Sequence, residues 1–167
     1  MTPLVSLYDY KAWANEELFP CVQRLEAAGE TAALHAAIRV LNHVYVVDRI
    51  FAANLEGRAP PYPDTNTPGT PTLAALSADV GATDTWYRRY VATLTPAAAA
   101  ETLDFVFVDG DPGRMTREEM LLHVINHGSY HRGAVGRILV ERGIAPPRDV
   151  YTRFLHAAEP DRRQRPG

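Results

Sequence analysis

The chain has 167 residues, a formal net charge of -3 and a hydrophobic content of 46%. This length suggests one domain that buries roughly two-thirds of the surface exposed by its unfolded chain. The small net charge gives no basic excess for binding nucleic acid or an anionic membrane. No window reaches the roughly eighteen continuous apolar residues of a membrane helix, and the N-terminus lacks the pattern of a secretory signal. We therefore expect a cytoplasmic protein without a nucleic-acid or membrane partner.

Cysteine and lysine each occur once, as Cys21 and Lys11. Cys21 has no internal disulfide partner and fits a reducing compartment, and no motif around it indicates a catalytic nucleophile. Nearly all basic charge is carried by arginine. We interpret the scarcity of lysine, like the abundance of alanine, as a compositional bias and assign no function to Lys11.

Apolar residues at helical spacing predict a first helix in the N-terminal region. Thr2 is its expected N-cap, Pro3 occupies the first helical position, and Gly29 ends it. Pro20 lies inside this pattern and is expected to bend or break the helix near Leu18, because proline cannot donate the helical hydrogen bond.

A second helix is predicted over residues 31–55, closed by Gly57 in the usual C-terminal glycine position. His43 lies on its apolar stripe, so its side chain should point inward. Residues 57–71 contain five prolines and two glycines and predict a long crossing loop. A third helix is predicted over 72–94.

Residues 103–108 carry the only strand signal, and Asp109-Gly110 indicates a hairpin turn. Thr116 and Glu119 have the form of a capping box, which opens a fourth helix extending to Arg142.

The chain is expected to end with a short helix over 148–157. We assign one domain to residues 1–158 and a frayed tail to residues 159–167. The long helices with one small hairpin indicate an all-α fold in which helices pack as a bundle.

Three of the six histidines, His123, His127 and His131, follow one another at intervals of four residues in the fourth helix. Residues four apart share one helix face, with Cβ atoms roughly 5–6 Å apart. Two neutral imidazoles so placed can share a metal at about 2.0–2.1 Å each, if a third ligand comes from elsewhere. The apolar stripe passes through His127 and His131, so we expect His123 to lie behind the ligands or at the surface.

The inward-facing His43 is the expected third ligand, which gives a metal site of His43, His127 and His131. Three imidazoles leave positions for water or substrate, as is typical of a reactive metal. Zinc or nickel suits imidazole ligands, with iron and manganese as alternatives. Imidazoles more than about 5 Å apart would exclude this site.

Two other kinds of metal centre lack support in the sequence. Gly128 follows His127, which excludes the His-Glu-x-x-His motif of zinc proteases. Neither candidate helix has a Glu-x-x-His pair, so a carboxylate-bridged di-iron centre is also unsupported.

Several segments resemble the DinB/YfiT-like family. They are Trp13-Ala-Asn15, Leu41-Asn-His43 followed by Asp48-Arg49, Asn126-His127-Gly-Ser-Tyr-His131-Arg-Gly133, and Asp149 after the paired prolines. The resemblance covers nearly the whole chain. It departs at Ala134, where relatives often have glutamine, and the family motif does not account for the proline-rich loop.

The resemblance implies a four-helix bundle of up-down-down-up connection, often a homodimer. It also implies a divalent metal on the histidines that match His43, His127 and His131. Relatives include metal-dependent transferases that use a low-molecular-weight thiol, and thiol-dependent isomerases with a similar domain.

The leading hypothesis is therefore a metalloenzyme that binds a thiol cofactor as thiolate on its metal and presents it to an electrophilic small-molecule substrate. The alternatives are a stress-related protein that binds a divalent metal without turnover, and a metal-dependent hydrolase. Hydrolysis ranks below thiol chemistry because the sequence shows no compelling base. Asp48, Tyr130 and Arg132 could support the site, but we favour structural or solvent-facing roles for all three.

Overall fold

The computed structural model describes residues 2–162. This part of the chain is mostly helical with one two-stranded antiparallel hairpin, as predicted. The long helices are α1 (Pro3–Ala27), α2 (Thr31–Leu55), α3 (Leu73–Thr93) and α5 (Arg117–Glu141). The short elements are α4 (Pro96–Ala99), β1 (Thr102–Val106), β2 (Pro112–Thr116), α6 (Tyr151–Ala158) and a 3-10 turn, η1 (Pro160–Arg162). The predicted tail thus begins with η1, and its last five residues lie outside the described residues.

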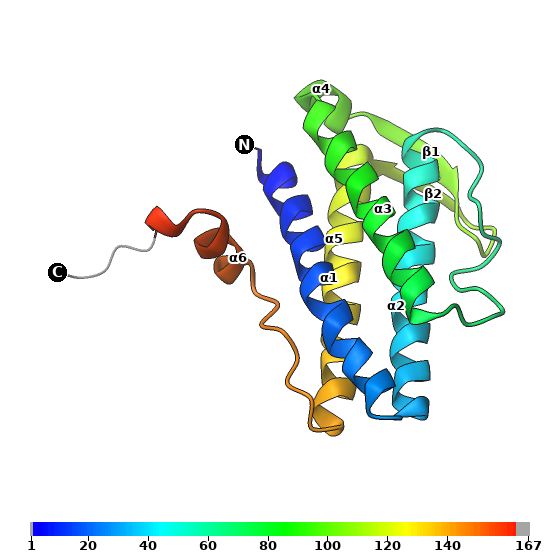
Figure 1. Ribbon diagram of the computed structural model, residues 1–167. Coiled ribbons are helices and arrows are strands. Elements are labelled where there is room, and N and C mark those ends of the chain that lie inside the picture. Colours follow the sequence, from blue (N-terminus) through cyan, green and yellow to red (C-terminus); the bar gives the residue numbers. More distant parts are fainter. Residues whose placement is uncertain (1, 163–167) are drawn as a thin grey trace.

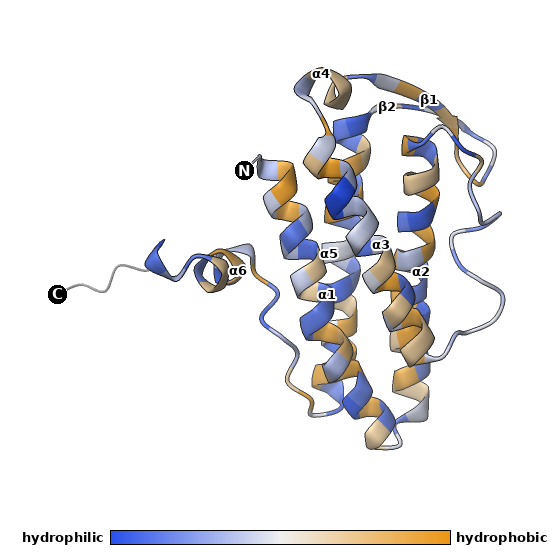
Figure 2. Ribbon diagram, turned by 45° about the horizontal axis from the view of Figure 1, so that its top comes forward, coloured by the Kyte–Doolittle hydropathy of each residue, from blue (hydrophilic) through white to orange (hydrophobic). Residues whose placement is uncertain are grey.

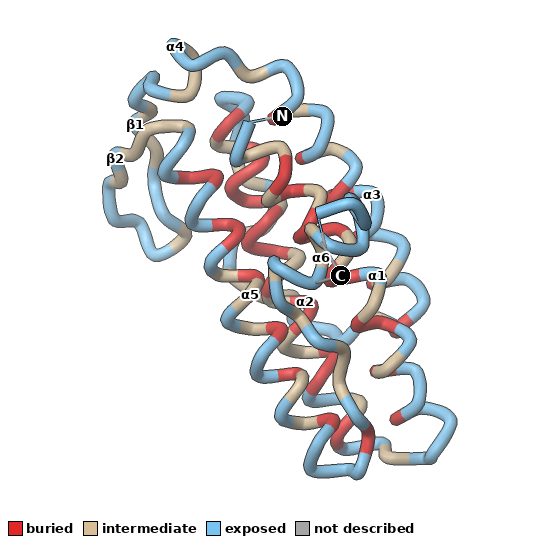
Figure 3. The backbone as a smooth tube through the Cα atoms, turned by 90° about the vertical axis from the view of Figure 1, so that its left-hand side faces the viewer, coloured by how far each residue is buried: buried red, intermediate tan, exposed pale blue. Residues whose placement is uncertain are grey.

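The four long helices lie side by side, and the hairpin lies against α2 and α5 near one end of them (Figure 1). Contacts join α2 to α5, α1 to α3, α1 to α5 and α2 to α3, so each long helix touches two or more others. Along each helix hydrophobic and hydrophilic residues alternate in patches (Figure 2), and the buried residues gather on the sides that face neighbouring helices (Figure 3). Burial of these apolar faces supplies most of the stability of such helices.

Helix α1 is continuous through Pro20, so a break of the helix there is wrong. Proline at this position removes the hydrogen bond to the carbonyl of Glu16. Both Pro20 and Glu16 are exposed, so water can satisfy that carbonyl. At its start the helix agrees with the prediction, because the side chain of Thr2 accepts a hydrogen bond from the backbone N–H of Val5.

Helix α2 has the predicted bounds, and Gly57 follows it with a φ of 65°. The proline-rich segment is free of regular secondary structure and connects α2 to α3, whose N-cap is Thr72. The loop is tied back to α2, because Arg39 donates to the carbonyl of Thr67 at 2.7 Å.

The hairpin pairs β1 with β2 in a register that places Phe105 opposite Gly113. Gly110 lies in the turn with a φ of 95°, a conformation that favours glycine. The predicted capping box at the start of α5 is present, with Glu119 as its N3 residue. The helix ends before Gly143, which has a φ of 69°.

The C-terminal segment returns along α1. Within it, the Tyr151 ring lies 5.4 Å from that of Tyr10, and the Phe154 ring lies 5.9 Å from that of Trp13, so α6 packs through aromatic contacts. Across residues 2–162, none of the helices combines the length and the hydropathy needed to span a bilayer.

Candidate metal centre

His43, His127 and His131 come together between α2 and α5. One ring nitrogen from each can be chosen so that all three lie within 4.8 Å of one another. The closest pair is His43 Nε2 and His127 Nε2, which are 3.0 Å apart. Two nitrogens bound to one cation at about 2.1 Å can be at most about 4.2 Å apart, so a small side-chain movement would suffice to bring all three onto one ion.

The orientation of His43 is fixed by the proline-rich loop. Its Nδ1 lies 2.8 Å from the carbonyl oxygen of Thr65. A carbonyl only accepts hydrogen bonds, so Nδ1 carries the proton and the lone pair of Nε2 points toward the other histidines. A backbone carbonyl in this position is the usual partner of a metal-binding histidine.

The loop itself is held by Asn42, the residue before His43. Its side-chain Nδ2 donates to Asn66 Oδ1 at 2.5 Å and to Thr67 Oγ1 at 2.7 Å. Asn42 is 2% exposed. Asn66 and Thr67 directly follow Thr65, so these bonds help to hold its carbonyl against the ring of His43.

The other two histidines, His127 and His131, have lowered pKa values. Burial, and then the charges that His131 and His43 would carry, lower the pKa of His127 to about 3. Burial, and then His43, lower the pKa of His131. Each imidazole therefore keeps a lone pair available at neutral pH.

Without a cation, either tautomer of His127 leaves a nitrogen unsatisfied. Its Nδ1 is buried and has no hydrogen-bond partner within the described chain. If Nδ1 is protonated, that donor is unpaired and the Nε2 lone pair faces the lone pair of His43. If Nε2 is protonated instead, Nδ1 is a buried acceptor without a donor. A cation bound by both Nε2 atoms would remove the repulsion between their lone pairs, whereas Nδ1 of His127 lacks a partner in either case. The cluster therefore fits a shared divalent cation better than it fits a self-contained hydrogen-bond network.

The predicted core positions of His127 and His131 need correction, because both side chains are only partly buried. The buried face of α5 runs instead through Gly128 and Arg132. Arg132 Nε donates to Asp149 Oδ2 at 2.7 Å, and a Cβ on Gly128 would lie 3.3 Å from Arg132 Nη1. Because a buried arginine occupies the stripe, the histidines are displaced to its edge, where a ligand can reach them.

His123 does not join the metal-ligand group. Its ring centroid lies 4.7 Å from that of Phe51 and 5.5 Å from that of His127, and the residue remains exposed. This agrees with the expectation that His123 lies beside the site. Of the proposed supporting residues, Tyr130 is 78% exposed, whereas Asp48 and Arg132 are buried in ion pairs.

A cavity of about 220 Å³ adjoins the histidines. His43 and His127 form part of its wall, together with residues from α2, the hairpin and His123. Apart from the imidazoles, its polar lining comes from Asn54 and Thr65, and no carboxylate, lysine or arginine lines it. The cluster is therefore bordered by a mostly apolar compartment.

Lys11, to which the sequence suggested no function, is the centre of a buried charged cluster. Its Nζ lies 2.8 Å from Asp48 Oδ2 and 2.6 Å from Asp84 Oδ1, and the residue is 1% exposed. Asn15 donates to the other oxygen of Asp84 at 2.8 Å.

A signal for this cluster existed in the sequence. Tyr8, Lys11, Asn15 and Leu18 follow at steps of three, four and three, which is the spacing of one helix face. Two polar residues on an otherwise apolar stripe predict a buried polar partner on another helix.

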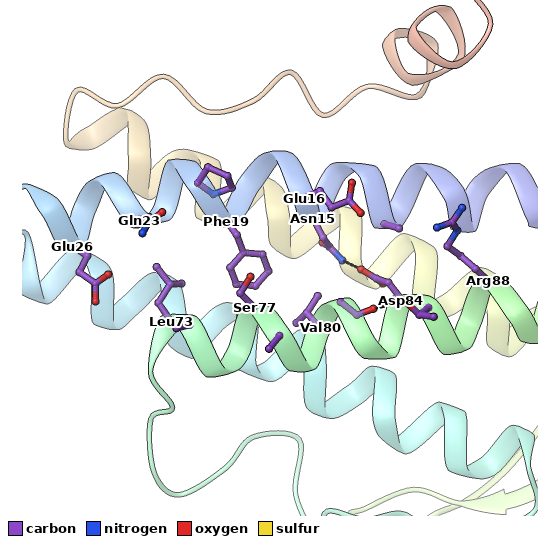
Figure 4. A pocket seen from close by; sticks show the side chains of 16 residues that line it. Asn15, Glu16, Phe19, Gln23, Glu26, Leu73, Ser77, Val80, Asp84 and Arg88 are labelled. Carbon is purple, nitrogen blue, oxygen red and sulfur yellow. Dashed lines mark hydrogen bonds between the residues drawn. The ribbon is translucent and has the colours of Figure 1, made fainter.

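A larger cavity, of about 600 Å³, lies between α1 and α3. Figure 4 shows Asn15 and Asp84 meeting on its wall, with Glu16 and Arg88 nearby. None of the three clustered histidines lines it. The histidines, whose ligand atoms are close enough together to share one ion, border the smaller cavity instead.

The comparisons with known proteins agree with the motifs. The DinB family profile matches residues 1–164. No curated protein and no solved structure gives a significant match. The family match spans nearly the whole chain and includes the three histidines of the cluster. The chain belongs to the DinB family.

Proposed function

We propose that the protein is a metal-dependent enzyme that transfers a low-molecular-weight thiol to an electrophilic small molecule. The observation that carries this proposal is the set of ring nitrogens from His43, His127 and His131 within 4.8 Å, without a carboxylate in the group. A divalent cation held there would favour deprotonation of a thiol near neutral pH.

The residues of this chain support that chemistry in two ways. The Thr65 carbonyl keeps Nε2 of His43 free for a cation, and the partly buried positions of His127 and His131 leave one side of the group open. In the transfer, sulfur forms a bond to an electrophilic carbon while the thiol proton leaves with the displaced group. The mostly apolar neighbouring cavity suits an electrophile better than it suits water, so we rank hydrolysis lower.

The same proposal takes the four long helices as one four-helix bundle of up-down-down-up connection, acting as a homodimer. It takes zinc or nickel as the bound metal, with iron and manganese as the alternatives. Sedimentation and metal analysis of the purified protein test these parts directly.

The deciding experiment is metal analysis after reconstitution with each of the four ions. We expect about one metal per chain in the wild type and a loss of more than tenfold in metal affinity for His127→Ala. His35→Ala is the matched control, because His35 is an exposed histidine of α2. A wild-type protein that retains less than a tenth of an equivalent would contradict the proposal.

Turnover is then tested by incubating the loaded protein with a panel of thiols and 1-chloro-2,4-dinitrobenzene. We expect loss of free thiol with wild type and His35→Ala but not with His127→Ala. Cys21 adds one protein thiol per chain, which a protein-only reaction measures. Full metal loading without any thiol consumption would instead favour the metal-binding protein without turnover.

A further inference from the structure

The hairpin builds an aromatic wall beside the histidine cluster. The ring of Phe105 lies 6.2 Å from that of Phe51, and Phe107 lies 4.7 Å from Phe105. Phe51 in turn lies 4.7 Å from His123. These rings, together with His127, line the cavity of about 220 Å³ described above.

We propose that this cavity binds a compact, uncharged, apolar group of the electrophilic substrate, about the size of one aromatic ring. This inference rests on the proposed function, because only that function makes the bound group part of a substrate. An apolar cavity of about 150 Å³ is large enough to hold benzene, so 220 Å³ accepts one substituted ring. His43 and His127 border the cavity, so a group bound there lies next to the candidate metal ligands.

The lining also selects against the thiol as occupant. Carboxylate and ammonium groups, which low-molecular-weight thiols of cells commonly carry, would lose their hydration here without meeting an opposite charge, because no charged side chain lines the cavity. The electrophile therefore takes this compartment, and the thiol must approach the histidines from another side.

Asn54 adds one polar feature. It lines the cavity, and its Nδ2 has no hydrogen-bond partner in the described part of the chain. Burial of an unpaired amide donor is unfavourable, and a rotation of the side chain that turns Nδ2 into the cavity would let a substrate acceptor such as a carbonyl or nitro oxygen satisfy it. The preferred substrate group is then a ring that carries one neutral acceptor.

Gly113 shapes the wall without lining the cavity. It pairs with Phe105 across the hairpin, and a Cβ on it would lie 2.5 Å from Cζ of the Phe105 ring. The glycine thus lets the ring lie flat across the neighbouring strand. Because the contact is with the far end of the Phe105 side chain, Gly113→Ala should move the ring while leaving the hairpin paired.

The test measures binding of toluene, acetophenone and benzoate to the metal-free protein by NMR titration. Metal-free protein is used so that the benzoate carboxylate cannot bind a metal. We expect saturable binding of toluene, with acetophenone binding roughly threefold to tenfold more tightly through one neutral hydrogen bond. Benzoate should bind at least tenfold more weakly than toluene. Equal or tighter binding of benzoate would overturn the inference.

Two variants and one control locate the binding. Gly113→Ala should weaken the binding of toluene and of acetophenone by at least threefold. Val106→Ala, at an exposed position of the same hairpin, should leave both affinities unchanged. Asn54→Leu should keep toluene binding and remove the preference for acetophenone. Unchanged affinities in Gly113→Ala, with the Phe105 resonances shifted, would show that the ring does not bind here and would overturn the proposal.

The two proposals fail separately. A protein that binds metal and consumes thiol but does not bind the ring probes loses this inference and keeps the proposed function. One that binds toluene in the cavity but holds no metal keeps an apolar binding site and loses the thiol chemistry.

Discussion

The two polar clusters between the long helices differ in whether each contains its own counter-charge. Lys11 meets Asp48 and Asp84 at 2.8 and 2.6 Å, so that charges of both signs are present and almost fully buried. The histidine cluster brings together three groups of the same kind with no counter-charge among them. Each cluster also keeps one buried atom without a hydrogen-bond partner among the described residues, Asp48 Oδ1 in the first and His127 Nδ1 in the second.

The difference is also one of position. The charged cluster joins α1, α2 and α3 in the interior, where its residues are shielded from water. The histidines lie at the edge of the buried face of α5, beside a cavity. The lysine cluster carries counter-charges of its own in the interior and is part of the structure. The histidine cluster has no counter-charge and can be reached from the cavity, which makes it a candidate for binding a ligand.

The largest expected effect comes from removing the only cation of the lysine cluster. Lys11→Met leaves Asp48 and Asp84 buried without a cation, which should cost about 3–5 kcal/mol in the free energy of unfolding. Urea denaturation measures this. Arg88→Met is the control, because Arg88 pairs with Asp9 at the surface and its side chain is 53% exposed, so its loss should cost about 1 kcal/mol or less. A cost below about 1 kcal/mol for Lys11→Met would show that the interior ion pairs are not needed.

The second largest effect is expected when a divalent metal is added to the histidine cluster. A divalent metal at about one hundred times its dissociation constant should add about 2.7 kcal/mol to the free energy of unfolding. For a chain of this size the unfolding midpoint should rise by roughly 5–10 °C, which calorimetry would detect. The metal should not raise the unfolding midpoint of His127→Ala, whereas it should raise that of His35→Ala as in the wild type. An equal rise in both variants would place the metal elsewhere.

Much of this fold follows from local sequence. Helix α2 could be placed to the residue because Gly57 and the prolines after it cannot continue a helix. The capping box of Thr116 and Glu119 likewise acts within four residues. The continuity of α1 through Pro20 could not be predicted, because it depends on whether the carbonyl of Glu16 faces water, and tertiary packing decides this.

The candidate site was predictable only in part. His43, His127 and His131 could be grouped because helical periodicity places each near an apolar face, and the structure brings them together. The Thr65 carbonyl could not be found, since a backbone group leaves no mark in the sequence and its loop has no periodicity. The lysine cluster could be predicted only as a polar spot on one helix face, because nothing local to Lys11 shows that Asp48 and Asp84 meet it from two other helices.

The two clusters also respond to acid in opposite directions. The pKa of His127 is lowered from 6.5 to about 3 in the folded protein, so the unfolded chain takes up the proton first as pH falls below 6.5. Stability present above that pH is therefore lost on acidification toward 3. Burial raises the pKa of Asp48 from 3.8 to about 6 despite Lys11, and its protonation below 6 favours the folded state instead.

A variant separates these contributions. Between pH 7.5 and 5, metal-free wild type should lose up to about 2 kcal/mol more stability than His127→Gln, measured by urea denaturation. Asp48 is unchanged in this comparison, so its opposite contribution cancels. Parallel stability curves for the two proteins would show that the His127 pKa is not lowered by burial.

The smallest effect tests whether the histidine cluster needs the loop to hold its geometry. Asn42→Ala removes the two hydrogen bonds that fix Asn66 and Thr67, the residues directly after Thr65, so the carbonyl that orients His43 should become mobile. Loss of such an orienting partner typically lowers metal affinity 10-fold to 100-fold, and here we expect about tenfold because the carbonyl itself remains.

The matched control for Asn42→Ala is Thr83→Ala. Thr83 is also 2% exposed and donates to the carbonyl of Asp79, but it does not contact the loop. Competition titration against a metal-chelating dye should show weaker metal binding only for Asn42→Ala. If both variants bind metal like the wild type, α2 alone orients His43. In that case the histidine cluster, like the lysine cluster, would be held by the helices alone.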